Sequence, residues 1–193
     1  DGALRYKVDD VAWRIQVHEN PVDDLGYFGW AVASSEALDV LTDRLKGAGV
    51  EPHEGDAELL ENRCAARIVW FLDPFGGRHE LVFGQSTYPG TFRPGRPISG
   101  FKTGEQGLGH IVYMVPDLWV ADDFFRNVLG FKLSDRVSIG GFGARFFHLT
   151  GRHHTLAIAQ TPNPKPGLNH LMIEVNDMLS VGTGYDLARD GGY

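Results

Sequence analysis

Two histidines occupy matching positions in two similar apolar segments of this sequence. His110 lies in residues 108–115 (LGHIVYMV), and His170 lies in residues 168–175 (LNHLMIEV). Both segments have the length and composition of buried strands, in which successive side chains point to opposite faces. If the two segments are related by pseudo-symmetry, both imidazoles line one cavity. Converging imidazoles are the beginning of a metal site.

A third segment, residues 25–32 (LGYFGWAV), has the same pattern but carries Tyr27 where the other two carry histidine. Taken alone, a histidine in an apolar strand is more often a hydrogen-bonded core residue than a ligand. Because the pattern is repeated, metal ligation becomes as good an interpretation of His110 and His170 as a role in the core.

A complete iron site of the non-haem Fe(II) oxygenase type needs a carboxylate beside two histidines. Glu174 follows His170 by four residues, which is about 13 Å along a strand and too far to share a metal with it. Glu80 belongs to the unit that carries Tyr27, and a solvated or N–H-capping carboxylate is its simpler interpretation. The residues alone therefore indicate no third ligand.

The pair His153-His154 begins another strand-like segment, directly after Arg152. Local sequence favours a polar turn. The functional alternative is a general acid/base, because an imidazole with an ordinary pKa near 6.5 exchanges protons at neutral pH. His154 would then point into the cavity of His110.

Composition restricts the class of protein. The chain has 193 residues, a net charge of −7 and one cysteine, Cys64. The acidic balance without a basic cluster argues against nucleic acid and membrane surfaces as partners. A single cysteine excludes an internal disulfide framework, and we find no signal peptide and no apolar run of the roughly 18 residues that a membrane span needs. We expect a cytoplasmic protein.

The elements recur along the chain. We predict a hairpin over residues 3–18, a helix capped at Ser34-Ser35 that ends at Gly47 or Gly49, and strands at 63–71 and 79–83. The His110 strand opens a second unit of the same kind, with a helix starting at Pro116-Asp117, and a last helix follows Asp177. The predicted organisation is an N-terminal domain (1–84), a proline-containing linker (85–107) and a C-terminal domain (108–193).

Four segments together resemble the type I extradiol ring-cleavage dioxygenases of the vicinal oxygen chelate superfamily, especially their 2,3-dihydroxybiphenyl 1,2-dioxygenase-like members. They are the two histidine strands, residues 124–131 (FFRNVLGF) and residues 151–157 (GRHHTLA). The resemblance implies an α+β fold of repeated βαβββ modules that form incomplete open barrels. By this comparison the chain is truncated at both ends and holds the end of module one, modules two and three, and the start of module four.

The resemblance also implies a site. His110 and His170 match the two histidine ligands of Fe(II), and His154 matches the histidine that acts as acid/base. The third ligand, a glutamate, is expected beyond Tyr193, and the N-terminal domain is expected to be metal-free. The implied reaction is cleavage of a bicyclic catechol such as 2,3-dihydroxybiphenyl beside its diol by O2. We expect a homo-oligomer, and we expect this chain alone to bind iron weakly and to be inactive.

Two alternatives remain open. The first is a non-enzymatic small-molecule-binding protein of the same superfamily, which would use the cavity without a redox metal. The second is an isomerase or lyase of the glyoxalase type, but the sequence offers no glutamates at matching positions. The doubled histidine strands favour the dioxygenase.

Overall fold

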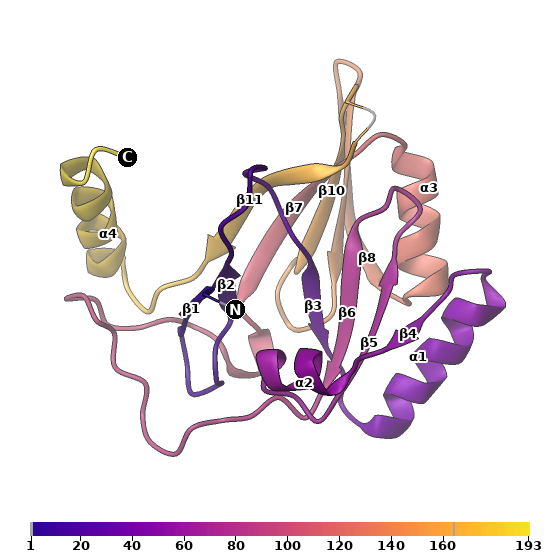
Figure 1. Ribbon diagram of the computed structural model, residues 1–193. Coiled ribbons are helices and arrows are strands. Elements are labelled where there is room, and N and C mark those ends of the chain that lie inside the picture. The colour runs from indigo at the N-terminus through magenta and orange to yellow at the C-terminus, as the bar shows by residue number, and fades with distance from the viewer. Residues whose placement is uncertain (1, 164) are drawn as a thin grey trace.

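Two open sheets with a helix packed on each make up most of the computed structural model, which describes residues 2–163 and 165–193 (Figure 1). The four-stranded sheet has the order β3-β6-β5-β4 and contains β3 (Phe28–Ala31), β4 (His53–Glu54), β5 (Arg67–Leu72) and β6 (Arg78–Phe83). The five-stranded sheet has the order β11-β7-β10-β9-β8 and contains β7 (Gly109–Val115), β8 (Lys132–Ile139), β9 (Phe142–His148), β10 (Leu156–Gln160) and β11 (Gly167–Ile173).

The two sheets repeat one topology. The first strand of each unit runs parallel to its last strand, β3 beside β6 and β7 beside β10, and the remaining pairs are antiparallel. A parallel pair needs a long crossover, and α1 (Ser35–Gly47) and α3 (Leu118–Asp123) lie within the two crossovers. The predicted α+β repeat is therefore confirmed, and within the described residues neither sheet closes into a barrel.

Local sequence explains where the main helices begin. The Ser34 side chain accepts a hydrogen bond from the Ala37 amide at the start of α1, and Asp177 caps α4 (Met178–Asp190) through the Ser180 amide. Both caps were predicted from the sequence. In the described part of the chain, no helix is long and apolar enough to cross a membrane.

The N-terminal hairpin forms as predicted from β1 (Leu4–Tyr6) and β2 (Ile15–Val17), but one strand prediction is partly wrong. Residues 63–71 do not form one strand, because α2 (Ala57–Arg63) ends at Arg63 and β5 starts only at Arg67. This helix buries none of its residues, so it has no apolar stripe by which the sequence could reveal it.

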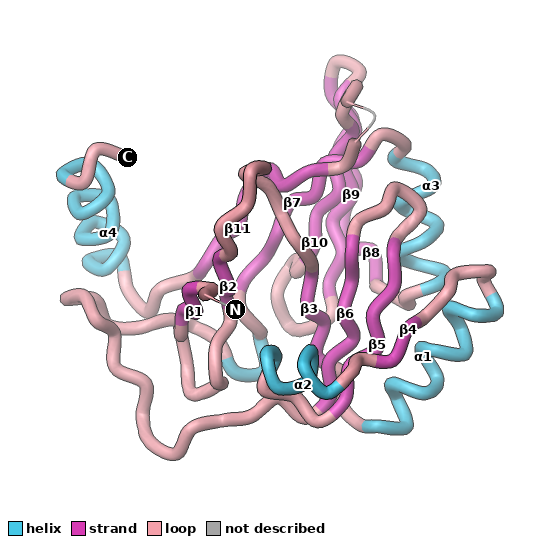
Figure 2. The backbone as a smooth tube through the Cα atoms, viewed as in Figure 1, coloured by secondary structure: helices cyan, strands magenta, loops and turns pink. Residues whose placement is uncertain are grey.

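Aromatic side chains join the two sheets in one core. Phe28 of β3 contacts Tyr113 of β7 edge to face at 4.9 Å, and Trp30 contacts Phe131 at 5.0 Å. Figure 2 shows the strands of the two sheets side by side between the β1–β2 hairpin and the helices α1 and α3. The proposed division into domains at 1–84 and 108–193 stays a prediction.

A buried carboxylate reinforces the contact between the sheets. Asp73, in the turn between β5 and β6, accepts a hydrogen bond from the Tyr113 hydroxyl at 2.8 Å and contacts His79 Nε2 at 3.1 Å. The other nitrogen of His79, Nδ1, accepts a hydrogen bond from the Trp30 indole. A Cβ at Gly77 would overlap the Tyr113 hydroxyl, so glycine is required at this turn.

This bond yields a prediction about stability. Tyr113→Phe removes the hydroxyl and leaves the buried Asp73 carboxylate short of one donor, so we expect a loss of about 1.5–3 kcal/mol of unfolding free energy. Urea denaturation measures it. Tyr185→Phe is the control because Tyr185 is 67% exposed, and a change of about 0.5 kcal/mol or less is expected there. Equal effects of the two variants would contradict the role given to Tyr113.

Candidate metal centre

Two adjacent antiparallel strands carry the two histidines. In the register of β7 and β11, Met172 lies opposite His110 and Val112 lies opposite His170. Residues directly opposite share a face of the sheet, and diagonal neighbours are within reach of long side chains. His110 and His170 are such a diagonal pair. The predicted convergence is therefore found in the structure, and it arises from direct strand pairing.

Close approach of the two backbones permits this pairing. A Cβ at Gly109 would overlap the Met172 carbonyl oxygen, so β11 could not lie at its present distance beside any other residue. The register also shifts between Leu168 and His170, which is the mark of a β-bulge and redirects the side chains that follow it. The glycine and the bulge together aim the two rings at each other.

The atoms that meet are the Nε2 nitrogens, 3.2 Å apart. His170 Nδ1 lies 2.7 Å from the Asn169 side-chain oxygen. Because that oxygen can only accept, a proton on Nδ1 would bond to it and leave the Nε2 lone pair free for a metal. Metal–imidazole bonds of about 2.1 Å at a right angle would place two nitrogens about 3 Å apart. The geometry of this pair fits one metal ion.

His154 completes the cluster of imidazoles. Its ring centroid lies 4.1 Å from that of His110, and Phe146 packs edge to face against it at 5.0 Å. His154 Nδ1 contacts His153 Nδ1 at 3.1 Å. The residue precedes β10, whose parallel pairing with β7 brings this turn beside His110. The turn is polar, as local sequence indicates, and it also places His154 at the site.

The environment favours the neutral form of two of these imidazoles, His110 and His154. Partial burial, together with the neighbouring His154, His170 and Arg152, lowers the pKa of His110 to about 4. Burial and the neighbouring His153 and His170 also lower the pKa of His154. A neutral imidazole has the lone pair that metal binding or proton acceptance requires. Both residues are therefore prepared for these roles at pH 7.

Glu174 does not join the cluster. Its carboxylate forms ion pairs with Lys102 at 2.7 Å and with Arg152, and hydrogen bonds from Lys102 and Arg152 lower its pKa. This agrees with the distance argument from the sequence. In residues 2–163 and 165–193, no three His, Cys, Asp or Glu side chains form a group that could hold a metal. Two imidazoles are what these residues offer a metal.

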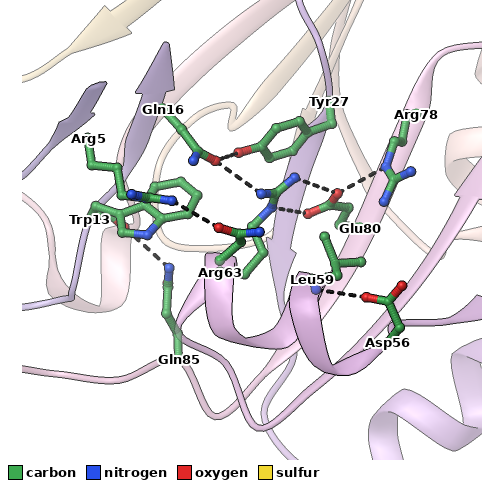
Figure 3. A network of polar contacts seen from close by, with 11 residues as sticks. Arg5, Trp13, Gln16, Tyr27, Asp56, Leu59, Arg63, Arg78, Glu80 and Gln85 are labelled. Carbon is green, nitrogen blue, oxygen red and sulfur yellow. Dashed lines mark hydrogen bonds and ion pairs between the residues drawn. The ribbon is translucent and has the colours of Figure 1, made fainter. Parts of the chain in front are cut away.

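The first unit uses its matching positions differently (Figure 3). Glu80, which has no exposed side-chain surface, receives two hydrogen bonds from Arg63 and one from Arg78. The Arg63 guanidinium also lies 4.0 Å from the centre of the Tyr27 ring and donates to Gln16, which accepts the Tyr27 hydroxyl as well. The Arg63 guanidinium thus compensates the charge of the buried Glu80 carboxylate.

Burial raises the pKa of Tyr27 to about 12, so its phenol remains a hydrogen-bond donor. Tyr27 and His110 both contribute to the wall of a cavity of about 1380 Å³ between the β1–β2 hairpin and the sheets.

Sequence reasoning missed Arg63, because the helix that carries it has no apolar pattern. Asn169 was also missed, although its position beside His170 was a usable signal.

Comparisons with known proteins agree with this architecture. Residues 107–193 match the model of the Glyoxalase/Bleomycin resistance protein/Dioxygenase superfamily. The chain is 43% identical over 192 residues to the biphenyl-2,3-diol 1,2-dioxygenase of Paraburkholderia xenovorans (strain LB400), covering 96% of the chain and 64% of that relative. It is 36% identical to the iron-dependent extradiol dioxygenase of Rhodococcus jostii (strain RHA1), covering 96% and 65%.

The crystal structure of BphC, a halotolerant catechol dioxygenase, superposes with a TM-score of 0.95 at 44% identity, over 100% of this chain and 64% of that one. The fold and these comparisons thus define a member of the Glyoxalase/Bleomycin resistance protein/Dioxygenase superfamily. Within it, the chain belongs to the extradiol dioxygenases. It spans about 64% of the length of the first of these relatives.

The lowered pKa of His110 predicts how stability responds to acid. In the unfolded chain His110 takes up a proton near pH 6.5, whereas in the folded chain it does so only near pH 4. The unfolded state therefore binds more protons between these two pH values. The unfolding free energy should therefore fall as the pH drops from 6.5 toward 4. Urea denaturation at several pH values measures this, and His110→Asn should flatten the dependence. A variant with an unchanged slope would contradict it.

The Arg63–Glu80 pair predicts a large cost for removing one partner. Arg63→Met leaves the buried carboxylate with Arg78 alone, and we expect a loss of about 3 kcal/mol of unfolding free energy. The double variant Arg63→Met/Glu80→Gln should recover part of it, because no buried carboxylate remains to be compensated and Arg78, whose side chain is 31% exposed, stays in contact with solvent. Chemical denaturation of the single and double variants measures both. A loss below about 1 kcal/mol in Arg63→Met would show that the pair is not needed.

Proposed function

We propose that this chain carries the greater part of the catalytic site of an extradiol dioxygenase, which opens a catechol ring beside its diol with O2. The supporting observation is the His110–His170 pair, with Nε2 nitrogens 3.2 Å apart and the His154 ring packed beside His110. Sequence identity of 43% to a biphenyl-2,3-diol 1,2-dioxygenase supports the same reaction class.

His110 and His170 would hold iron. Two imidazoles that leave positions open for a carboxylate and for substrate are the donor set of non-haem Fe(II) oxygenases, and one relative is named an iron-dependent extradiol dioxygenase. A glutamate beyond Tyr193 is the third ligand that the resemblance implies. Bound Fe(II) would supply the Lewis acidity and the electron that bring a catechol and O2 to reaction.

The chain's own residues would orient the substrate. Val112, Ala157 and Phe146 lie opposite one another on neighbouring strands, and His170 lies opposite Val112. They therefore share the face of the sheet that carries the imidazoles. This apolar row offers a surface against which an aromatic ring packs, while its two hydroxyl groups face the histidines. A second ring, as in 2,3-dihydroxybiphenyl, would extend along the same row.

His154 would move the proton. Its Nδ1 is engaged by His153, and Nε2 has no hydrogen-bond partner in the described part of the chain. With its pKa lowered by burial and by neighbouring histidines, His154 is neutral at pH 7. Nε2 can therefore accept a proton from a catechol hydroxyl and return it as the ring opens. General acid–base catalysis of this kind contributes about 10²–10⁴-fold to a rate.

Substitutions separate the two roles. In a polypeptide of the relatives' full length, His110→Ala should abolish both bound iron and the yellow product formed from 2,3-dihydroxybiphenyl. His154→Gln should keep the iron and lower the rate about 100-fold or more. Metal analysis and absorbance under air measure both. His53→Ala, which alters a histidine stacked on Trp70 in the first unit, should change neither.

The chain alone should bind Fe(II) or Co(II) weakly, because a site with two ligands lacks part of its coordination shell. Anaerobic titration tests this, and tight stoichiometric binding would contradict it. A full-length protein that binds the catechol but consumes no O2 would refute the dioxygenase and favour the non-enzymatic binding protein.

A further inference from the structure

One arginine connects the segments that carry all three clustered histidines. The side chain of Arg152 is only 7% exposed, although it belongs to a turn. Its Nε donates to the Gln106 carbonyl oxygen at 3.0 Å, and its Nη2 donates to the Lys102 carbonyl oxygen at 2.7 Å. Its Nη1 donates to the Glu174 carboxylate. All three guanidinium nitrogens are therefore engaged.

These partners lie next to the histidine-bearing elements. Arg152 precedes His154 by two residues, Gln106 precedes His110 by four, and Glu174 follows His170 by four. The guanidinium thus bonds to the turn of His154, to the chain entering β7 and to the chain leaving β11.

A second layer of contacts braces the same junction. The Lys102 ammonium pairs with Glu174 at 2.7 Å, and the Lys102 amide donates to the Glu174 carbonyl oxygen. Phe101 and Val175 form an isolated antiparallel bridge. The planar guanidinium offers donors in a fixed fork, so its three acceptors must keep their relative places. A displacement of any segment would strain or break at least one charge-assisted bond.

We propose that Arg152 is the positioning residue of this site: it holds the His154 turn in register with the His110 and His170 strands. It touches none of the reacting groups and acts through the backbone that carries them. The inference rests on the proposed function for its purpose, because the cluster that Arg152 arranges is the one assigned to metal and proton. Its geometry is independent of whether metal binds.

The competing possibility is that Arg152 is only a stabilising ion pair. Arg14 provides a matched control, because its guanidinium makes several bonds to Asp9 with side-chain exposures of 18% and 10%, in the N-terminal segment. Arg152→Ala and Arg14→Ala each remove a partly buried pair. Only the first should disturb the histidines, whereas both should lower the urea midpoint.

The test reads the histidine rings directly. In the metal-free protein, the ring protons of His154 experience ring currents from Phe146 and His110, and NMR resolves these shifts. Arg152→Ala should move the His154 resonances toward those of an exposed histidine and weaken Co(II) binding about tenfold or more. Arg14→Ala should leave both unchanged. Glu174→Gln, which weakens one of the three bonds, should produce a smaller shift in the same direction.

The outcomes are distinct. Unchanged His154 resonances and Co(II) affinity in Arg152→Ala would overturn the proposal, even if stability falls. If Arg152→Ala does not fold, Glu174→Gln decides, and unchanged resonances there also overturn it. If the unaltered chain binds no Co(II), the proposed metal function fails, while the ring shifts still test the positioning role.

Discussion

The antiparallel pairing of β7 with β11 is the constraint on which the candidate site depends. A diagonal pair of side chains on two such strands meets only if the register is correct and the backbones are close. Gly109 permits the approach to the Met172 carbonyl, and the bulge after Leu168 sets the direction of the residues that follow. A slip of one residue would turn His170 to the opposite face, and the imidazole pair would not form.

The two units show two ways to satisfy one topology. In each, a strand carrying an aromatic or imidazole ring lies parallel to the last strand of its unit. The first unit places Glu80 on its last strand, β6, and compensates it with Arg63. The last strand of the second unit, β10, has no carboxylate among its described residues 156–160, and this unit gathers imidazoles instead. A buried carboxylate needs a cation beside it. The Arg63 guanidinium meets this need in the first unit.

Much of this could be predicted from the sequence, because strand alternation and repetition leave clear marks. The apolar pattern around His110 and His170 located both strands, and the caps at Ser34 and Asp177 located two helices. The convergence of the histidines followed from the repeat. Their direct pairing in one sheet did not, since periodicity does not say which strands are neighbours. Arg63 and Arg152 were also beyond reach, because their partners are distant in sequence.

The position of Arg152 also has an electrostatic consequence. A fixed positive charge beside an imidazole disfavours its protonation, and Arg152 is one of the groups that lower the pKa of His110. Neighbouring histidines act in the same direction on His110 and His154, because positively charged rings packed together would repel one another. The Glu174 carboxylate would oppose this effect if it faced the rings. Because it is bonded to Arg152 and Lys102, its charge is compensated by these two cations. The arginine that we propose holds these segments in place therefore also favours the neutral form of His110.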